Sequence, residues 1–96
     1  MYKILIVEDD PVIASSLARQ LTRWNYEATY VQEFDHVMQE FEKAQPDLVL
    51  MDITLPYFSG YYWCAEIRKI SRVPIVFLSS AADEMNQVMA LSMGAD

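Results

Sequence analysis

The chain has 96 residues, 53% of them hydrophobic and 22% charged, and this composition is ordinary for one globular domain. The formal net charge of −7 argues against direct binding of nucleic acid and favours a divalent cation or a basic partner. No apolar stretch approaches the roughly 20 residues that span a bilayer, and an expected strand begins almost at Met1, so we expect neither a membrane span nor a signal peptide. The single cysteine, Cys64, excludes an internal disulfide and suits a reducing cytoplasm.

Apolar strands alternate with amphipathic helices along the chain. The expected strands cover residues 3–7, 26–31, 48–51 and 75–78, and the expected helices cover about 11–25, 35–44, 61–70 and 83–93. Asp10 is expected to cap the first helix with Pro11 at its first position, while Pro46 stops the second and Gly94 ends the fourth. Four such units predict an α/β fold with a doubly wound parallel sheet and right-handed crossovers.

Carboxylates follow two of the expected strands. Glu8 and Asp9 come directly after the first strand, and Asp52 closes the third. In a doubly wound sheet, ligands bind outside the carboxyl ends of the strands at the switch point in strand order, where Ser79 is also expected. Because crowded carboxylates are costly unless a metal ion or a phosphoryl group uses them, the sequence predicts an acidic site at this edge.

The basic residues are expected at the opposite edge of the sheet. Helices run antiparallel to the strands in this architecture, so their C-termini lie away from the acids and are complemented there by positive charge. All seven basic residues belong to strand starts, helix ends or the next loop: Lys3, Arg19, Arg23, Lys43, Arg68, Lys69 and Arg72. The acidic site therefore receives no cation from this chain, and something else must neutralise it.

Mg²⁺ is the ion that this set of oxygen ligands favours. Asp9 and Asp52 can each give one carboxylate oxygen, the backbone carbonyl of Thr54 a third, and Glu8 can hold a bound water. With the metal in place, Asp52 keeps a free oxygen for nucleophilic attack on phosphorus, which forms an acyl phosphate. The hydroxyl of Ser79 can donate a hydrogen bond to a phosphoryl oxygen.

Together these motifs resemble one known family, the receiver domains of two-component response regulators. The matching stretches are residues 4–10, 48–56 with Gly60, 74–80 and 94–96. The resemblance implies a flavodoxin-like (CheY-like) fold, with Asp52 as phosphoacceptor and Glu8 and Asp9 as the acidic metal pair. It also implies that Thr54 supplies the backbone ligand and Ser79 the switch hydroxyl. Residues 55–64 resemble regulators of envelope stress and antimicrobial-peptide resistance in Gram-positive bacteria, in the winged-helix OmpR/PhoB-type group.

The sequence departs from this family at its end. A receiver domain of the family continues beyond residue 96 with a fifth strand, whose lysine pairs with the phosphoryl group, and a fifth helix. Lys3, Lys43 and Lys69 cannot replace that lysine, because all three map to the other edge. We therefore expect residues 1–96 to form a receiver that lacks its last β-α unit, binds Mg²⁺ and phosphorylates poorly. An exposed fourth strand predicts a homodimer, by edge pairing or strand exchange.

The expected function is phosphorelay signalling. Asp52 is expected to accept a phosphoryl group from a sensor histidine kinase in the cytoplasm, and to control a regulator that contacts DNA only through a separate effector domain. The chain is not expected to be an enzyme beyond its own phosphorylation. An aspartyl phosphatase would favour a carboxylate where Thr54 stands, and a flavodoxin-like nucleotide binder would need glycines in the first loop. Whether Tyr57, Tyr62 and their neighbours Tyr61 and Trp63 form core or a kinase-docking surface stays open.

Overall fold

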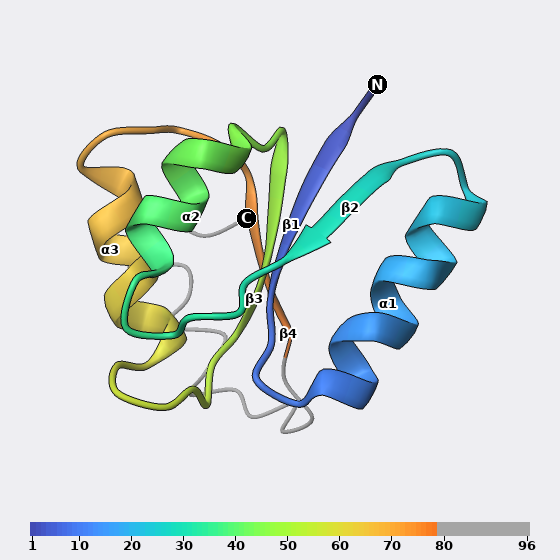
Figure 1. Ribbon diagram of the computed structural model, residues 1–96. Helices are drawn as coiled ribbons and strands as arrows, with labels where there is room; N and C mark the ends of the chain where they lie inside the picture. The colour runs from blue at the N-terminus through green and yellow to red at the C-terminus, as the bar shows by residue number, and fades with distance from the viewer. Residues whose placement is uncertain (79–96) are drawn as a thin grey trace.

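Helices and strands alternate through the described part of the chain. The computed structural model describes residues 1–78. Its elements in chain order are β1 (Lys3–Val7), α1 (Pro11–Arg23), β2 (Glu27–Tyr30), α2 (Val37–Ala44), β3 (Leu48–Asp52), α3 (Gly60–Arg68) and β4 (Ile75–Leu78), as Figure 1 shows. The predicted fourth helix and Ser79 lie outside the described residues. Within residues 1–78, no helix has both the length and the apolar character that a bilayer crossing requires.

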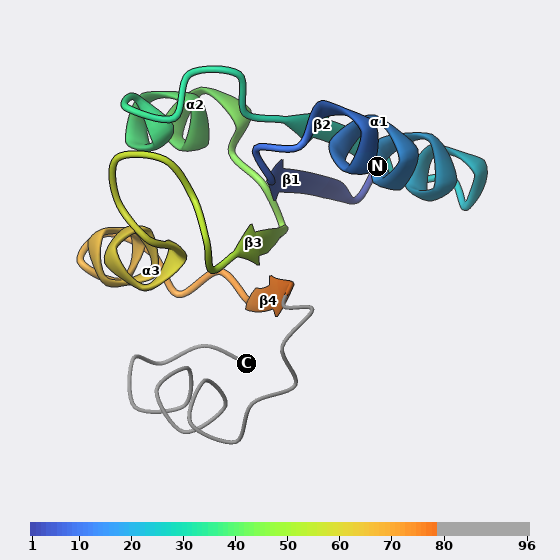
Figure 2. The same cartoon turned by 90° about the horizontal axis from the view of Figure 1, so that it is seen from below.

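The strands form one parallel sheet in the order β2-β1-β3-β4. Helix α1 lies on one face of this sheet, and α2 and α3 lie on the other (Figure 2). The predicted doubly wound arrangement is therefore confirmed. Its switch point lies between β1 and β3, where Val7 and Met51 are partners in register. The residues that follow this pair leave the sheet side by side at its carboxyl edge.

The main hydrophobic core lies between the sheet and the helices α2 and α3. Successive strand residues point to opposite faces, so alternate positions of the strands meet these helices. The buried residues of this core are Leu5, Val7, Val31, Val37, Phe41, Val49, Met51, Trp63, Cys64, Ile67 and Ile75. Because β3 passes through this core, Asp52 stands at the end of a rigid element.

The other face of the sheet is covered over only part of its width. Helix α1 packs mainly against β1 and β2, with Ala14 buried in the contact. Beside it lies an apolar cavity of about 460 Å³, lined by Tyr2, Ile4, Leu21, Trp24, Tyr26, Leu48 and Leu50. No helix within residues 1–78 covers β3 and β4 on this face (Figure 2).

Most element boundaries agree with the sequence prediction within two residues. The largest difference at a helix start is at α2, which begins at Val37 and not near residue 35. The carboxylate of Glu40 accepts hydrogen bonds from the backbone N–H groups of Gln32 and Glu33, which holds the preceding segment in a turn. His36 therefore lies at the N-cap of α2 as an exposed residue, one position outside the helix in which the sequence placed it.

Candidate acidic site at the carboxyl edge

Three carboxylates from two strand ends meet at the switch point. Glu8 and Asp9 follow β1, and Asp52 is the last residue of β3. Each offers one oxygen, and these three oxygens all lie within 4.8 Å of one another. The predicted convergence of these side chains is therefore observed. Hard oxygen ligands at this spacing fit a small divalent cation such as Mg²⁺.

The start of α1 fixes which acids can take part in the site. The side chain of Asp10 accepts hydrogen bonds from the backbone N–H groups of Val12 and Ile13, at 2.9 and 3.3 Å. Pro11 occupies the first helical position, so the predicted cap is confirmed. Because the Asp10 carboxylate caps the helix, Asp9 and not Asp10 is the aspartate available to face Asp52.

Glu8 is the buried member of the cluster, with 8% of its surface exposed. Its carboxylate accepts a hydrogen bond from the backbone N–H of Asp10 at 3.0 Å, which favours the ionised form. Burial is the largest cause of the pKa shift of Glu8, and it outweighs the effect of that bond. The nearby charge of Asp52 and hydrogen bonds to Asp52 and Asp9 act in the same direction as burial. Together they raise the pKa of Glu8 from 4.5 to about 7. The protein alone therefore holds a proton at Glu8 over a pH range in which an ordinary glutamate is ionised.

The loop after β3 is tied directly to Asp52. The backbone N–H of Thr54 donates to the Asp52 carboxylate at 3.4 Å, and Thr54 itself is exposed. The backbone N–H of Gly60 donates to the carbonyl of Ile53 at 2.9 Å, which closes the loop onto the end of the strand. A Cβ at position 60 would overlap the carbonyl oxygen of Asp52 and lie 3.0 Å from the Cγ of Met51. Only glycine fits this approach without a shift of the backbone.

Positive charge lies at the other edge of the sheet. Lys3 begins β1, and Lys43 and Arg68 lie in the last turns of α2 and α3. Within residues 1–78, none of the three clustered carboxylates forms an ion pair. Residues 79–96 contain no lysine, arginine or histidine. The charge separation expected from the sequence is therefore present for these residues.

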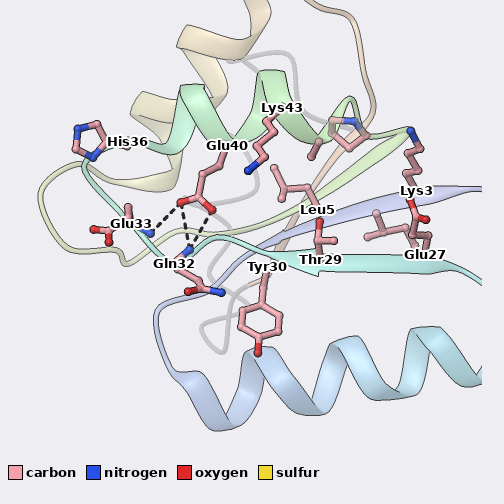
Figure 3. Close-up of a pocket in the computed structure, with 13 residues that line it drawn as sticks. Lys3, Leu5, Glu27, Thr29, Tyr30, Gln32, Glu33, His36, Glu40 and Lys43 are labelled. Carbon is pink, nitrogen blue, oxygen red and sulfur yellow. Dashed lines mark hydrogen bonds between the residues drawn. The ribbon is translucent and has the colours of Figure 1, made fainter.

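A larger cavity, of about 690 Å³, lies elsewhere, between α2 and the edge strand β2 (Figure 3). Lys3, Glu27 and Lys43 are among its lining residues, and Glu40 is bonded there to the backbone of the β2–α2 loop. The lining carries side chains of both signs. Glu8, Asp9 and Asp52 are not among the residues that line this larger cavity.

Sequence reasoning found the three acids but missed two features of the site. The steric need for Gly60 depends on how closely α3 approaches β3, which the sequence pattern does not show. The raised pKa of Glu8 depends on burial, for which the signal was its place directly after the apolar run that ends at Val7. Ser79 lies outside the described residues, and the metal-ligand role of the Thr54 carbonyl stays a prediction.

Comparison with known proteins places this geometry in one family. The family model of the response regulator receiver domain matches residues 4–96. The chain is 50% identical over 96 residues to the uncharacterized transcriptional regulatory protein YvcP of Bacillus subtilis, covering all of this chain and 40% of that protein. It is 44% identical over 94 residues to the response regulator protein GraR of Staphylococcus epidermidis, covering 98% of this chain and 42% of that protein. The chain thus spans about two-fifths of the length of these curated relatives.

A solved structure gives the same result. The N-terminal domain of the nisin resistance regulator NsrR, a lantibiotic response regulator, aligns with a TM-score of 0.90 and 54% identity, covering all of this chain and 81% of that one. The phosphatase and nucleotide-binder alternatives gain no support from these matches. The chain belongs to the family of response regulator receiver domains.

Proposed function

We propose that Asp52 accepts a phosphoryl group, and that Glu8, Asp9, Asp52 and the backbone carbonyl of Thr54 hold Mg²⁺ beside it. The observation that supports this most directly is the approach of three carboxylate oxygens from β1 and β3 to within 4.8 Å of one another. Separate segments of the chain build this crowding, and like charges at that distance repel. A bound cation offsets this repulsion, so the cluster can act as a metal-binding site.

The chain's own groups have distinct parts in the proposed transfer. One oxygen of Asp52 forms a bond to phosphorus while the bond from phosphorus to the leaving group breaks, and the leaving group departs with the bonding electrons. The Thr54 N–H holds the other side of the carboxylate, at 3.4 Å, and so orients the attacking oxygen. Bound Mg²⁺ supplies the charge that offsets the phosphoryl oxygens. Ser79 is proposed as the hydroxyl that donates a hydrogen bond to the product.

The proposed donor is a sensor histidine kinase, and the proposed setting is the cytoplasm. The relatives are named as response regulators and as a transcriptional regulatory protein, and they are more than twice as long as this chain. We therefore propose that residues 1–96 act as the receiver of a longer regulator, whose effector domain contacts DNA and whose phosphorylation favours a homodimer. In this role the chain changes its own state and is not an enzyme acting on other substrates.

Mg²⁺ is expected to stabilise the folded protein, by about 2.7 kcal/mol when its concentration is 100 times Kd. Between pH 4.5 and about 7 the folded state binds a proton at Glu8 that the unfolded chain has lost, so the stability of the metal-free protein falls as pH rises through this range. The metal needs the ionised carboxylate, so its stabilising effect is expected to be larger at pH 8 than at pH 6. Thermal unfolding at pH 6 and pH 8, with Mg²⁺ and with EDTA, measures the metal effect and its pH dependence.

Asp9→Asn and Asp35→Asn are the matched pair of variants for this measurement. Asp9 belongs to the cluster, whereas Asp35 is an exposed aspartate paired with His36 at 3.0 Å. The Mg²⁺ effect is expected to disappear in the first variant and to persist in the second. Loss of the Mg²⁺ effect in Asp35→Asn, with the effect kept in Asp9→Asn, would show that the ion binds instead near Glu33, Asp35 and His36, which also lie close together on the surface.

In a polypeptide limited to residues 1–96, acetyl phosphate is expected to label slowly, at one site, and only when Mg²⁺ is present. The three lysines of the sequence all lie in elements or turns of the amino edge, so none can assist the phosphoryl group at Asp52. Intact-mass spectrometry over time, with and without EDTA, measures the rate and the metal requirement. Labelling as fast as in a receiver that has the family lysine would contradict the proposed dependence on that residue, and labelling in EDTA would contradict the metal site.

A further inference from the structure

Three exposed aromatic side chains lie together beside the acidic cluster. Tyr57 and Phe58 belong to the β3–α3 loop and are 74% and 45% exposed, and Tyr62, in the first turn of α3, is 40% exposed. These three residues are called the aromatic patch below. Large aromatic side chains normally contribute to a protein core, and a group of them left in water marks an interaction surface.

Two rings of the patch, those of Phe58 and Tyr62, are held in place by packing. The rings of Phe58 and Tyr62 stack with centroids 4.2 Å apart and an interplanar angle of 18°. Both meet the ring of Trp63 edge-on, at 5.6 and 4.9 Å. Trp63 is buried in the main core, so it anchors the exposed rings to the body of the domain. When a partner binds this surface, these side chains of the receiver therefore lose little conformational freedom.

The backbone adopts a costly conformation that keeps Tyr57 in solvent. Its φ is +68°, in the left-handed region that disfavours residues with a Cβ. The N–H of Phe58 donates to the carbonyl of Pro56 at 2.8 Å, which makes a tight three-residue turn with Tyr57 at its centre. A strained tyrosine that gains no burial from its strain is unexplained by folding alone. Strain of this kind is concentrated at functional sites.

The position of the patch links it to the phosphoacceptor. Phe58 and Tyr62 are each two residues from Gly60, so their Cα atoms lie within about 8 Å of its Cα. Gly60 in turn touches the backbone of Asp52. Any macromolecule that brings a phosphoryl group to Asp52 must cover the surface around that residue, and the aromatic patch is part of this surface.

Electrostatics defines the chemistry of a suitable partner. The edge around Asp52 carries Glu8, Asp9 and Asp10 and, within residues 1–78, no lysine or arginine. A complementary surface presents apolar side chains to the rings and a lysine or arginine to the acids, and a guanidinium can also lie over a tyrosine ring.

We propose that the aromatic patch is the docking surface for the protein that carries the phosphoryl donor, and that this protein seats apolar side chains and a cationic side chain on it. This inference rests on the proposed function and adds the surface that recognises the donor. The patch acts in binding, and the transfer chemistry stays with Asp52. A small phosphodonor has no such surface to recognise, so it is expected to be indifferent to the patch.

The test compares two donors on the same variants. Tyr57→Asn removes the ring and places at the left-handed position a residue that tolerates it, and Tyr62→Gln removes the ring from an exposed helical position. Tyr26→Gln is the matched control, because Tyr26 is 37% exposed and lies at the amino edge. The donors are acetyl phosphate and an autophosphorylated sensor histidine kinase, chosen from the source organism as the one that labels the wild-type chain fastest.

The double variant Tyr57→Asn/Tyr62→Gln is expected to lose about 10-fold or more in kcat/KM for transfer from the kinase, through a higher KM, while its labelling by acetyl phosphate stays unchanged. The control is expected to match wild type with both donors. Kinase transfer within twofold of wild type would overturn the inference, as would an equal loss with both donors. If neither donor labels even the wild-type chain, the proposed function itself fails, and this result is distinct from failure of the docking surface.

Discussion

The Asp52→Asn variant is expected to lose phosphoryl labelling entirely and, in the absence of metal, to be more stable than the wild-type chain. The amide cannot attack phosphorus at neutral pH, so the nucleophile is gone. The same change removes a negative charge from a cluster of three carboxyl groups whose oxygens lie within 4.8 Å of one another. Relief of that repulsion is expected to be on the order of 1 kcal/mol at a partly solvated site.

Urea unfolding in EDTA and mass spectrometry after acetyl phosphate treatment measure the two effects. Asp35→Asn is the control, because it makes the same chemical change at an exposed aspartate outside the cluster. The stabilising effect is expected to vanish when Mg²⁺ is added, since the ion stabilises only the wild-type site. Persistent labelling of Asp52→Asn would assign the phosphoryl group to another residue, and lower stability in EDTA would mean that the carboxylates do not repel.

The Gly60→Ala variant is expected to lose about 1–3 kcal/mol of stability, the typical cost of forcing an extra carbon into a packed site. The new Cβ meets the backbone carbonyl of Asp52, and a backbone atom cannot turn aside as a flexible side chain can. The start of α3 must then move away, which weakens the 2.9 Å hydrogen bond from the Gly60 N–H to Ile53. The loop that orients Asp52 moves with it, so a lower Mg²⁺ affinity is expected as well.

Ser59→Ala separates the clash from an ordinary weakening of the helix start. Ser59 caps α3, and its hydroxyl accepts the N–H of Tyr62 at 3.3 Å. Its loss is expected to cost about 1 kcal/mol without displacing the loop from β3. Chemical denaturation of both variants, followed by Mg²⁺ titration, makes the comparison. If Gly60→Ala unfolds at the same urea concentration as wild type, the close approach is not a constraint in solution.

The sheet and the acidic cluster follow from the sequence because both depend on local patterns. Continuous apolar runs are typical of parallel strands covered on both faces, and the predicted bounds of β1 and β4 match the structure. Once parallel strands are assigned, residues at their carboxyl ends must share one edge, so Glu8, Asp9 and Asp52 converge for topological reasons. No side-chain geometry was needed to predict that.

The features that could not be predicted depend on contacts between distant segments. The later start of α2 results from Glu40 binding the backbone seven and eight residues before it, which competes with the helical pattern of Phe34 and Asp35. The left-handed backbone of Tyr57 has no signal in the residue type, because glycine or asparagine is the usual occupant of that region. The pKa of Glu8 likewise depends on how completely the folded chain excludes water from it.

Trp63 provides the molecule with an internal optical reporter. Its side chain is 5% exposed, its Nε1–H finds no acceptor among the described residues, and the rings of Phe58 and Tyr62 lie against it. Indole emission depends on local polarity and on neighbouring quenchers. A movement of the β3–α3 loop, which Gly60 holds against Asp52, is expected to change both around Trp63. Trp24 is 60% exposed and gives a water-like background, which replacement by phenylalanine removes. The fluorescence of the remaining indole then follows events at the carboxylates without any attached dye.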